Sequence, residues 1–527
     1  MISNTKNNSK SGSLYLNKNI PLIAALLVLI AHLLGNPHYG FFRDELYFII
    51  CGRHPDWGYV DQPPIVPLLA AGSQIFGHSL FLLRTIPAIC AAVSVYISCL
   101  IVIELEGGKF AQILVAIAVF FCPILMALTV TLNTDSFGGI TWPLVGLLVL
   151  RVIKYDNPRL WVMIGIILGI AFQIKYSIIF FALALLTGIV FTQQRRYLYS
   201  RWVIVGAVLG LAIVLPNVIW QSHYNFPMLK LLHNDQIHKN VMLSPWQYLL
   251  SQLAFTGQFL SIIWMIGIGF FWHKRQTRSL AIMFVVLIGL MVLFHGKGYY
   301  TSGIYPIFMA GGAVAIEFWT IKFKFVRSII ISIVILCGLF LYLPDMMPIL
   351  PEPLFIKYNQ IKIKIYDKTF SSIYSANVTK TENVMEGALP QQYADMHGWP
   401  ELASKVAEIV AKLPDSERQR AVIITNNYGQ AAALEFFGEK YHLPQVMSFH
   451  NQYYIWGLKS INNGDVVVRV GGDCDGGIHL YSSEILAGKL LDNKYVRPDE
   501  NQLPIMICRG IKTSLPDFWI KHGPYYN

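Results

Sequence analysis

A polar segment that follows the first apolar run of the chain, Ile20 to Leu34, decides the fold. It reads Phe41-Phe42-Arg43-Asp44-Glu45-Leu46-Tyr47 and continues to Trp57-Gly58-Tyr59-Val60-Asp61-Gln62-Pro63-Pro64. An acidic pair directly after a membrane span is costly to keep there, and such residues mark functional sites. The segment therefore predicts a membrane protein and places its site beside the first span.

The composition is that of a polytopic membrane protein. Of the 527 residues, 54% are hydrophobic and 13% are charged, whereas a soluble domain carries about 25% charged residues. The net charge of +11 would suit nucleic acid. The basic residues instead lie in short loops between apolar runs, which is the pattern of cytoplasmic loops, so binding of nucleic acid is disfavoured.

The apolar runs predict a polytopic α-helical membrane protein with about 11 to 13 transmembrane helices, since a span needs about 20 residues. The runs are 20–34, 80–104, 109–128, 136–153, 160–173, 177–192, 202–220, 248–271, 279–295, 301–319 and 327–344.

The charges of the loops predict the orientation. With the N-terminus in the cytoplasm, every inner loop is basic, as the positive-inside rule requires. The inner loops hold Lys109; Arg151, Lys154 and Arg159; Arg195, Arg196 and Arg201; Lys274, Arg275 and Arg278; and Lys322, Lys324 and Arg327.

This orientation divides the chain into a cytoplasmic tail (1–19), a transmembrane domain (20–344) with a first outer loop (37–79), and an extracytoplasmic domain (345–527). The unusual polar residues then converge at the outer face of the membrane. They are Asp44, Glu45, Asp61, Asp135, Lys175, His223, Lys297, Tyr299 and Tyr300.

The last part of the chain reads as a small α/β domain, because strands at 421–425 and 465–470 alternate with helices at 401–413 and 430–437. It has no GxGxxG fingerprint, so a nucleotide role is unsupported. Cys474 and Cys508 lie in this part. They are able to pair in an oxidising compartment, but the sequence leaves the pairing open.

The outer face has no nucleotides, and no Walker A pattern occurs. A transferase acting there needs a lipid-linked activated donor such as a polyprenyl-phosphate sugar. Its site requires a carboxylate base for the acceptor hydroxyl and cations or hydroxyls for the phosphate. Asp44 and Glu45 diverge by about 100° on a helix, so one is expected to be the base and the other an orienting group.

Several segments in order resemble the C-type (GT-C) membrane glycosyltransferases of family 39, which include protein mannosyltransferases and aminoarabinose transferases. They are Asp44-Glu45 with Tyr59-Val60-Asp61-Gln62-Pro63-Pro64; Thr134-Asp135; Ile174-Lys175-Tyr176; Pro216-Asn217-Val218-Ile219-Trp220; Gly298-Tyr299-Tyr300 through Tyr305-Pro306 to Gly311-Gly312-Ala313; Leu389 to Trp399; and Asn451 to Gly457.

The resemblance implies the GT-C fold and an inverting transfer from a polyprenyl monophosphate sugar, with Asp44 as base and Glu45 beside it. Candidates for binding substrate or the lipid phosphate are Arg43, Tyr59, Asp61, Asp135, Lys175, Lys297, Tyr299 and Tyr300. Gln62 replaces a lysine of the aminoarabinose transferases. This puts an aminoarabinose donor in doubt and moves the phosphate role to Lys175, Lys297 or Arg43.

Each candidate also has a structural interpretation. Asp44 or Asp135 would cap a helix, Glu45 would pair with Arg43 or Arg53, and Asp61 would form a turn. Lys175 would reach to the interface, and Tyr299 and Tyr300 would belong to an aromatic belt.

The expected partners are the polyprenyl-phosphate sugar, membrane lipids, and an acceptor hydroxyl or phosphate of a protein, lipid A or another glycan. No cofactor is expected, and no cluster in the sequence has metal-ligand spacing. A carboxylate and a histidine from distant loops could still come together to bind a metal. The competing functions are a polymerase or ligase that uses a lipid diphosphate, and a transporter or flippase.

Overall fold

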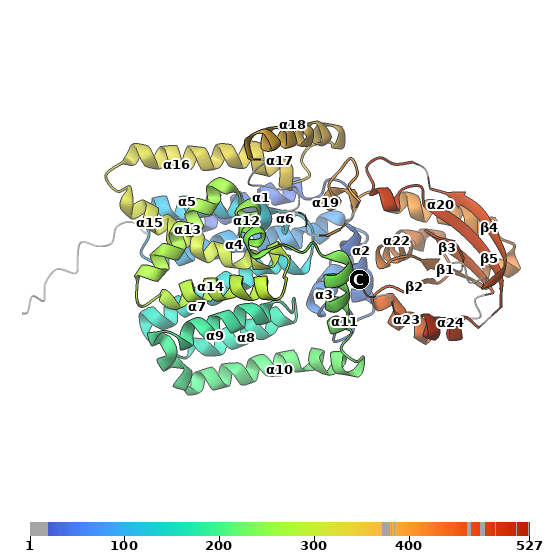
Figure 1. The fold of residues 1–527 in the computed structure, drawn as a ribbon, viewed down its shortest axis with the longest axis horizontal. Coiled ribbons are helices and arrows are strands. Elements are labelled where there is room, and N and C mark those ends of the chain that lie inside the picture. The colour runs from blue at the N-terminus through green and yellow to red at the C-terminus, as the bar shows by residue number, and fades with distance from the viewer. Residues whose placement is uncertain are drawn as a thin grey trace, which may run out of the picture.

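The structure is a computed structural model that describes residues 19–370, 380, 382–383, 385–460, 465–474, 480–490, 492–512, 514–524 and 526. Figure 1 shows a bundle of helices with a smaller sheet-containing domain at one end. Apart from Asn19, the tail expected at 1–19 lies outside the described residues.

The helices of the bundle follow the apolar runs of the sequence. They are α1 (Asn19–Gly35), α4 (Leu80–Glu104), α5 (Lys109–Phe120), α6 (Pro123–Ala127), α7 (Gly138–Tyr155), α8 (Leu160–Phe172), α9 (Ile178–Val190), α10 (Arg201–His223), α12 (Pro245–Thr256), α13 (Gln258–His273), α14 (Arg278–Leu293), α15 (Tyr305–Trp319), α16 (Lys324–Cys337) and α17 (Leu343–Met346).

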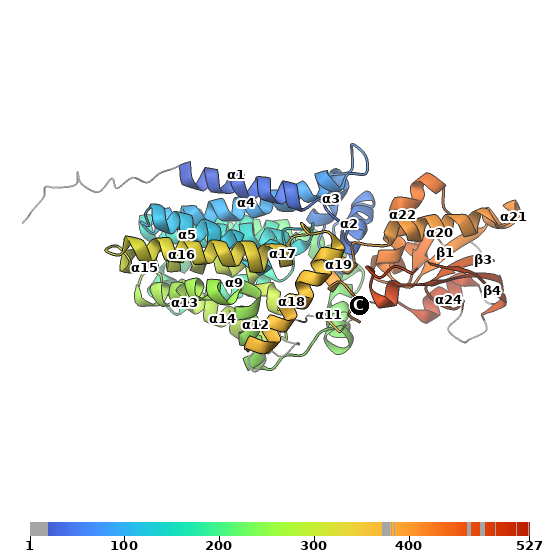
Figure 2. The same ribbon diagram turned by 90° about the horizontal axis from the view of Figure 1, so that it is seen from above.

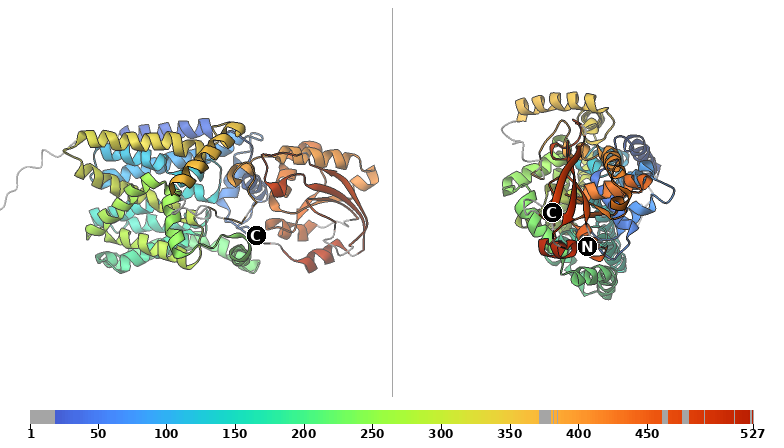
Figure 3. Two further views of the ribbon diagram at one scale, coloured as in Figure 1. Left: turned by 45° about the horizontal axis from the view of Figure 1, so that its top comes forward. Right: turned by 90° about the vertical axis from the view of Figure 1, so that its right-hand side faces the viewer.

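Short helices connect them. These are α2 (Arg43–Arg53), α3 (Ile65–Gly72), η1 (Thr134–Phe137), η2 (Gln193–Tyr199), α11 (Pro227–Asn234), η3 (Asp235–Lys239), η4 (Gly298–Ile304) and η5 (Gly338–Tyr342). A longer helix, α18 (Glu352–Phe370), runs across the outside of the bundle beside α17 (Figure 1 and Figure 3).

Within the described residues, four helical segments are long and apolar enough to cross a membrane: Leu80–Glu104, Thr134–Tyr155, Arg201–His223 and Lys324–Met346. Two further pairs, α9 with η2 and α12 with α13, qualify if each pair is one span bent by 110°. The helices α1, α5, α8 and α14 are shorter but apolar. The protein is therefore a helical multi-pass membrane protein, and the count of 11 to 13 spans stays a prediction.

Helix α12 supports η4, the segment that carries Tyr299 and Tyr300. From α12, Gln252 donates a hydrogen bond to the carbonyl of Gly298 at 3.2 Å and accepts one from Thr301 at 2.7 Å. A buried amide with both of its groups satisfied fixes its neighbours in one arrangement.

The basic loops lie at the end of the bundle away from the sheet domain (Figure 1 and Figure 2). Arg151 pairs with Glu104 at 2.9 Å, and Arg196 pairs with Asp156 at 3.0 Å. Glu317 accepts from the backbone N–H of Phe110 at 3.1 Å. The loops assigned to one side from their charges therefore do share one end of the bundle.

Two glycine pairs hold α10 against α8. A Cβ added to Gly206 would lie 2.3 Å from the carbonyl oxygen of Trp161, and one on Gly165 would lie 2.0 Å from that of Gly206. Gly169 and Gly210 repeat this contact one turn further on. Small residues spaced by four let membrane helices approach closely. The face of α10 that points away from α8 is exposed. The glycine contacts with α8, which we call the glycine seam, are therefore its main attachment.

The sheet domain contains five strands in the order β2-β1-β3-β5-β4. Strands β2, β1 and β3 are parallel, and β5 and β4 join antiparallel. Its elements are α19 (Gln391–Ala394), α20 (Trp399–Ala411), α21 (Asp415–Arg418), β1 (Ala421–Thr425), α22 (Tyr428–Gly438), η6 (Glu439–Tyr441), β2 (Val446–Ser448), α23 (Gln452–Ser460), β3 (Val466–Val470), β4 (Tyr481–Lys489), η7 (Pro498–Glu500), β5 (Pro504–Ile511) and α24 (Leu515–His522).

Alternation along β1 gives the sheet two apolar faces. Ile423 packs with Val406 of α20 and with α22, whereas Val422 packs on the opposite face with Trp519 of α24. The expected strands and helices of a small α/β domain are therefore present. The short β2, the antiparallel pair β4 and β5, and α24 were not expected.

The carboxyl ends of the parallel strands face the bundle. Tyr428 follows β1 and contacts Asp44, and Asn451 follows β2 and contacts Asp61. This edge of an α/β sheet is where ligands usually bind. Here it is closed against the segment 37–79, the predicted first outer loop.

Cys474 and Cys508 form a disulfide that ties the segment after β3 to β5. The pairing that the sequence left open is therefore made. Such bonds persist in oxidising compartments.

We predict that Gly206→Ala separates α10 from α8. The new methyl group has no room, and overpacking of this kind costs about 1–3 kcal/mol. The midpoint of thermal unfolding in detergent should fall. Gly289→Ala is the matched control, because no heavy atom lies within 4 Å of a Cβ at Gly289. Equal midpoints for the two variants would contradict the proposed seam.

Candidate active site

The two acids of the first outer loop have different environments. Both lie in the first turn of α2. Glu45 is completely buried and points into the bundle. The side chain of Asp44 is 32% exposed and faces the sheet domain. Their divergence on the helix is the one expected for adjacent residues.

Glu45 is held by Arg84 of α4. The guanidinium NH2 lies 2.9 Å from Oε2 of Glu45. The carboxylate also accepts from the backbone N–H of Phe42 at 2.8 Å and of Leu132 at 2.9 Å. Glu45 is thus enclosed by Arg84 and two backbone N–H groups. Its ionic partner is Arg84, not Arg43 or Arg53.

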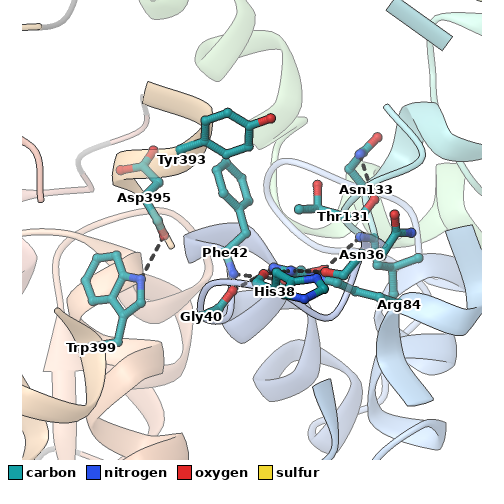
Figure 4. A network of polar contacts seen from close by, with 12 residues as sticks. Asn36, His38, Gly40, Phe42, Arg84, Thr131, Asn133, Tyr393, Asp395 and Trp399 are labelled. Atoms are coloured by element: carbon teal, nitrogen blue, oxygen red, sulfur yellow. Dashed lines mark hydrogen bonds and ion pairs between the residues drawn. The ribbon is translucent and has the colours of Figure 1, made fainter. Parts of the chain in front are cut away.

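Arg84 also fixes the backbone of the first outer loop (Figure 4). It donates to the carbonyls of Asn36 at 2.6 Å, His38 at 2.9 Å and Gly40 at 2.7 Å. We call Arg84, Glu45 and these carbonyls the loop clamp. The clamp sets where α2 begins, and hence where Asp44 stands.

Asp44 meets the sheet domain directly. Oδ1 accepts a hydrogen bond from the hydroxyl of Tyr428 at 2.7 Å and lies 3.5 Å from Nε of Arg43. The described residues offer no hydrogen bond to Oδ2. One oxygen of the carboxylate is thus held, and the other is available to a substrate.

Arg43 is directed to the sheet domain. Its backbone N–H donates to the carbonyl of Asp395 at 3.0 Å, and its NH2 lies 3.8 Å from Oδ2 of the same residue. Arg497 approaches Asp395 from the other side at 3.6 Å. Trp399 also donates to that carbonyl at 2.8 Å (Figure 4). These contacts join Arg43 to the sheet domain, and its expected role in binding phosphate stays a prediction.

Asp61 lies between the first loop and the sheet domain. It accepts from the hydroxyl of Tyr47 at 3.0 Å and from the amide of Asn451 at 3.4 Å. Burial raises the pKa of Asp61 to about 7, against the lowering effect of the Tyr47 hydrogen bond, and the charge of Asp44 adds to the rise. A carboxyl that titrates near neutral pH is suited to moving a proton.

Tyr59, expected to bind substrate, lies outside the site. Its side chain is completely buried, and its hydroxyl donates to the carbonyl of Cys51 at 2.7 Å. It braces the loop after α2. Its place in the motif gave no sign of which way the side chain points.

Asp135 and Lys175 form an ion pair beside η4. The helix start at η1 is capped by Asn133, whose Oδ1 accepts from two backbone N–H groups, so Asp135 is not needed as a cap. The ammonium of Lys175 lies 4.3 Å from the ring centre of Tyr300 and 5.6 Å from that of Tyr299.

A small pocket opens beside this pair. Asp135, Lys175 and Tyr300 supply its polar lining, and Trp142 and Ile178 belong to its apolar lining. An ammonium at the edge of an apolar pocket suits a ligand with an anionic head and a hydrocarbon tail.

Lys297 has a different partner, Glu382, at 2.6 Å, and Lys239 approaches the same carboxylate at 3.6 Å. Burial opposes ionisation of Glu382, but the charges of the two lysines outweigh it and hold its pKa well below the usual range. Lys297 lines a second small pocket together with Tyr248 and Lys380.

The charged groups around η4 interact electrostatically with Tyr299. Burial raises the pKa of Tyr299, and the charges of Asp135, Glu382 and Asp44 contribute to the rise. Asp135, Glu382 and Asp44, which come from three different segments, therefore all lie within electrostatic reach of η4. The described residues contain no cluster of three or more His, Cys, Asp or Glu side chains able to hold a metal.

Several residues of the site were missed from the sequence. Arg84 lies within an apolar run, and Glu382 stands in a segment without periodicity. Tyr428 is part of the Asn426-Asn427-Tyr428-Gly429 turn. Only its place after a predicted strand marked it, since such turns often carry ligand contacts.

We predict that Arg84→Met destabilises the protein by about 3–5 kcal/mol, because it leaves the Glu45 carboxylate buried without its counter-charge. The control is Arg151→Met, which breaks a partly exposed pair with Glu104 worth about 0–1 kcal/mol. Thermal unfolding in detergent measures both. Similar midpoints would show that the loop clamp contributes little.

Comparison with known proteins identifies the fold. Residues 61–220 match the family model described as dolichyl-phosphate-mannose-protein mannosyltransferase. No curated protein matches the chain significantly in sequence.

Solved structures extend the likeness to the whole chain. ArnT from Cupriavidus metallidurans in the apo state matches with a TM-score of 0.59 and 15% identity, over 93% of this chain and 97% of that one. The same protein bound to undecaprenyl phosphate gives 0.57 and 14% over the same shares. An oligosaccharyltransferase from Archaeoglobus fulgidus gives only 0.47 and 13%, over 81% and 62%. The chain has the GT-C fold, and its match over residues 61–220 confirms the resemblance to the family 39-like GT-C glycosyltransferases.

Proposed function

We propose that the protein is an inverting glycosyltransferase that moves a sugar from a polyprenyl-phosphate donor to an acceptor at the outer face of the membrane. One observation carries the proposal. The carboxylate of Asp44, one oxygen of which is held by Tyr428, and the ammonium of Lys175, which lines a pocket, both lie within electrostatic reach of Tyr299.

Asp44 is the proposed base. Its free oxygen takes the proton of the acceptor hydroxyl, whose oxygen then attacks the anomeric carbon of the sugar. The bond from that carbon to the phosphate oxygen breaks, and its electron pair leaves with the polyprenyl phosphate. Because the leaving group is already a stable anion, the reaction needs no general acid. Attack opposite the leaving group inverts the anomeric centre.

The basic and tyrosyl groups around η4 are the proposed site for the lipid phosphate. Lys175 is paired with Asp135. We propose that its ammonium binds the lipid phosphate while Asp135 stays beside it. The neighbouring pocket would take the first part of the polyprenyl chain. Lys297 and Tyr300 provide a further cation and a hydroxyl group to this proposed phosphate site.

The comparisons support this donor class. ArnT, which shares the fold over nearly all of both chains, was solved with undecaprenyl phosphate. Gln62, at the position of the aminoarabinose transferases' lysine, is buried and donates to Sγ of Cys51 at 3.8 Å. It therefore braces the loop, and we place the phosphate role on Lys175 and Lys297.

The orientation is part of the proposal. The basic end of the bundle would face the cytoplasm of the inner membrane. The sheet domain, at the other end, would be extracytoplasmic, and its Cys474–Cys508 disulfide suits that compartment. The acceptor would be a hydroxyl or phosphate group of a protein, lipid A or another glycan. The proposed reaction uses no metal or other cofactor.

We predict that wild-type protein in lipid releases undecaprenyl phosphate from one member of a panel of radiolabelled undecaprenyl-phosphate sugars. Asp44→Asn should lower the rate by about a hundredfold or more, since general-base catalysis contributes 10²–10⁴-fold. EDTA should leave the rate unchanged. Asp61→Asn is run beside it, because Asp61 is the other carboxyl that would accept a proton.

Asp56→Asn is the matched control, since Asp56 is an exposed acid of the same loop and, among the described residues, its side chain accepts only from the next backbone N–H. Full activity of Asp44→Asn in a folded protein would show that Asp44 is not the base. Turnover of lipid-diphosphate donors alone would favour a polymerase or ligase. If no donor of the panel released its lipid phosphate, a transporter would be favoured.

We predict opposite labelling of cysteines placed at the two ends of the molecule. In intact cells, a membrane-impermeant maleimide should label Gln419→Cys on the sheet domain. It should label Tyr199→Cys, in the basic loop of η2, only after lysis. Tyr199 is 89% exposed, so access does not limit the reaction. The reverse pattern would invert the proposed topology.

A further inference from the structure

The sheet domain reaches the proposed base through one side chain. The hydroxyl of Tyr428 donates to Oδ1 of Asp44 at 2.7 Å, between residues 384 apart in the sequence. Building on Asp44 as the base, we propose that Tyr428 is a positioning residue of the active site. It fixes the Asp44 carboxylate through the hydrogen bond to Oδ1, so that the C-terminal domain completes the catalytic centre.

The backbone around Tyr428 is held on both sides. Asn427 accepts from the backbone N–H of Gln430 at 3.0 Å and so caps α22, while its own amide donates to Glu500 at 2.8 Å. A Cβ on Gly429 would lie 2.3 Å from Cγ of Arg43. The helix start is therefore pressed against α2, and α22 has little freedom to withdraw Tyr428.

The ring is held as well. Its centre lies 4.6 Å from that of Tyr47 and 4.9 Å from that of His450, and the guanidinium of Arg43 lies 5.3 Å away over the same ring. The hydroxyl consequently has a single direction, towards Asp44. A donor that needs no reorganisation during the reaction is what electrostatic positioning requires.

Tyr428 acts as a donor across the working pH range. Burial raises its pKa well above the ordinary value, and the charge of Asp44 adds to the rise although Arg43 opposes it. The hydroxyl engages Oδ1, the oxygen that Arg43 also approaches. This leaves Oδ2 directed to the acceptor hydroxyl.

A test of Tyr428 must leave unchanged the other titratable and charged groups in electrostatic reach of Asp44. They are Arg43 on the same helix, Asp61 in the first loop, Asp395 beside α19, and Tyr299 on η4. A change confined to the hydroxyl of Tyr428 leaves all four in place.

The test is Tyr428→Phe, assayed for release of undecaprenyl phosphate from the donor that wild type turns over. The carboxylate loses a donor that favours its ionised form. The acidic limb of the profile of kcat/KM against pH should therefore move up by about one pH unit. A hydrogen bond to a charged group is worth about 1.5–3 kcal/mol, so kcat should fall about tenfold or more.

The matched control is Tyr393→Phe. Tyr393 is also buried, and its hydroxyl donates across the boundary between the two parts, to the carbonyl of Asp345 at 3.0 Å. It has no contact with Asp44. If Tyr428 served only to dock the domain, both variants would lower stability and neither would move the pH profile. That result, or an unchanged profile in Tyr428→Phe, would overturn the proposal.

A fluorinated tyrosine at position 428 keeps the ring and strengthens the donor. It should move the acidic limb to lower pH, the direction opposite to that of phenylalanine. This variant keeps the test valid if Tyr428→Phe does not fold.

A readout without turnover separates this inference from the proposed function. Carbodiimide reacts with protonated carboxyl groups, and mass spectrometry of the Asp44 peptide measures the extent at each pH. Tyr428→Phe should extend the labelling to higher pH than wild type, even if no donor of the panel is consumed. Identical labelling curves would refute the contact, whatever the activity.

Discussion

The structure depends on a buried ion pair. Removing the charges of Arg84 and Glu45 from water costs several kcal/mol per ion. The cost is offset because Arg84 is bound by three backbone carbonyls, and Glu45 by two backbone N–H groups. One of those N–H groups belongs to Leu132, just before η1. The pair therefore fixes together the first outer loop, the start of α2 and the segment that carries Asp135.

With these segments fixed, the two parts of the protein divide the chemistry between them. The bundle offers ammonium groups beside apolar pockets, which suits the phosphate and tail of a lipid. The sheet domain offers hydroxyl and amide donors to Asp44 and Asp61. The carboxylates lie at the boundary between the helical bundle and the sheet domain. On the proposed function, a sugar passing from a lipid-linked donor to an acceptor would cross that boundary.

Much of the bundle could be predicted because apolar length and loop charge act locally. The segment 80–104 coincides with α4, and the loops of Arg151 and Arg196 do share one end. The directions of side chains were not predictable, since tertiary contacts set them. Glu45 and Tyr59 have the residue types of a site but face inward. Arg84 was hidden in an apolar run, and Glu382 joined the site only through contacts with distant lysines.

The strands β4 and β5 escaped prediction because much of β4 is exposed, so its pattern lacks a clear apolar face. The separation of 384 residues between Asp44 and Tyr428 has a consequence for biogenesis. Chains are made from the N-terminus, so the bundle enters the membrane while the sheet domain is still unmade. On the proposed assignment, the catalytic centre stays incomplete until the last fifth of the chain has been exported and docked. A nascent or shortened chain would then occupy the membrane without consuming its donor.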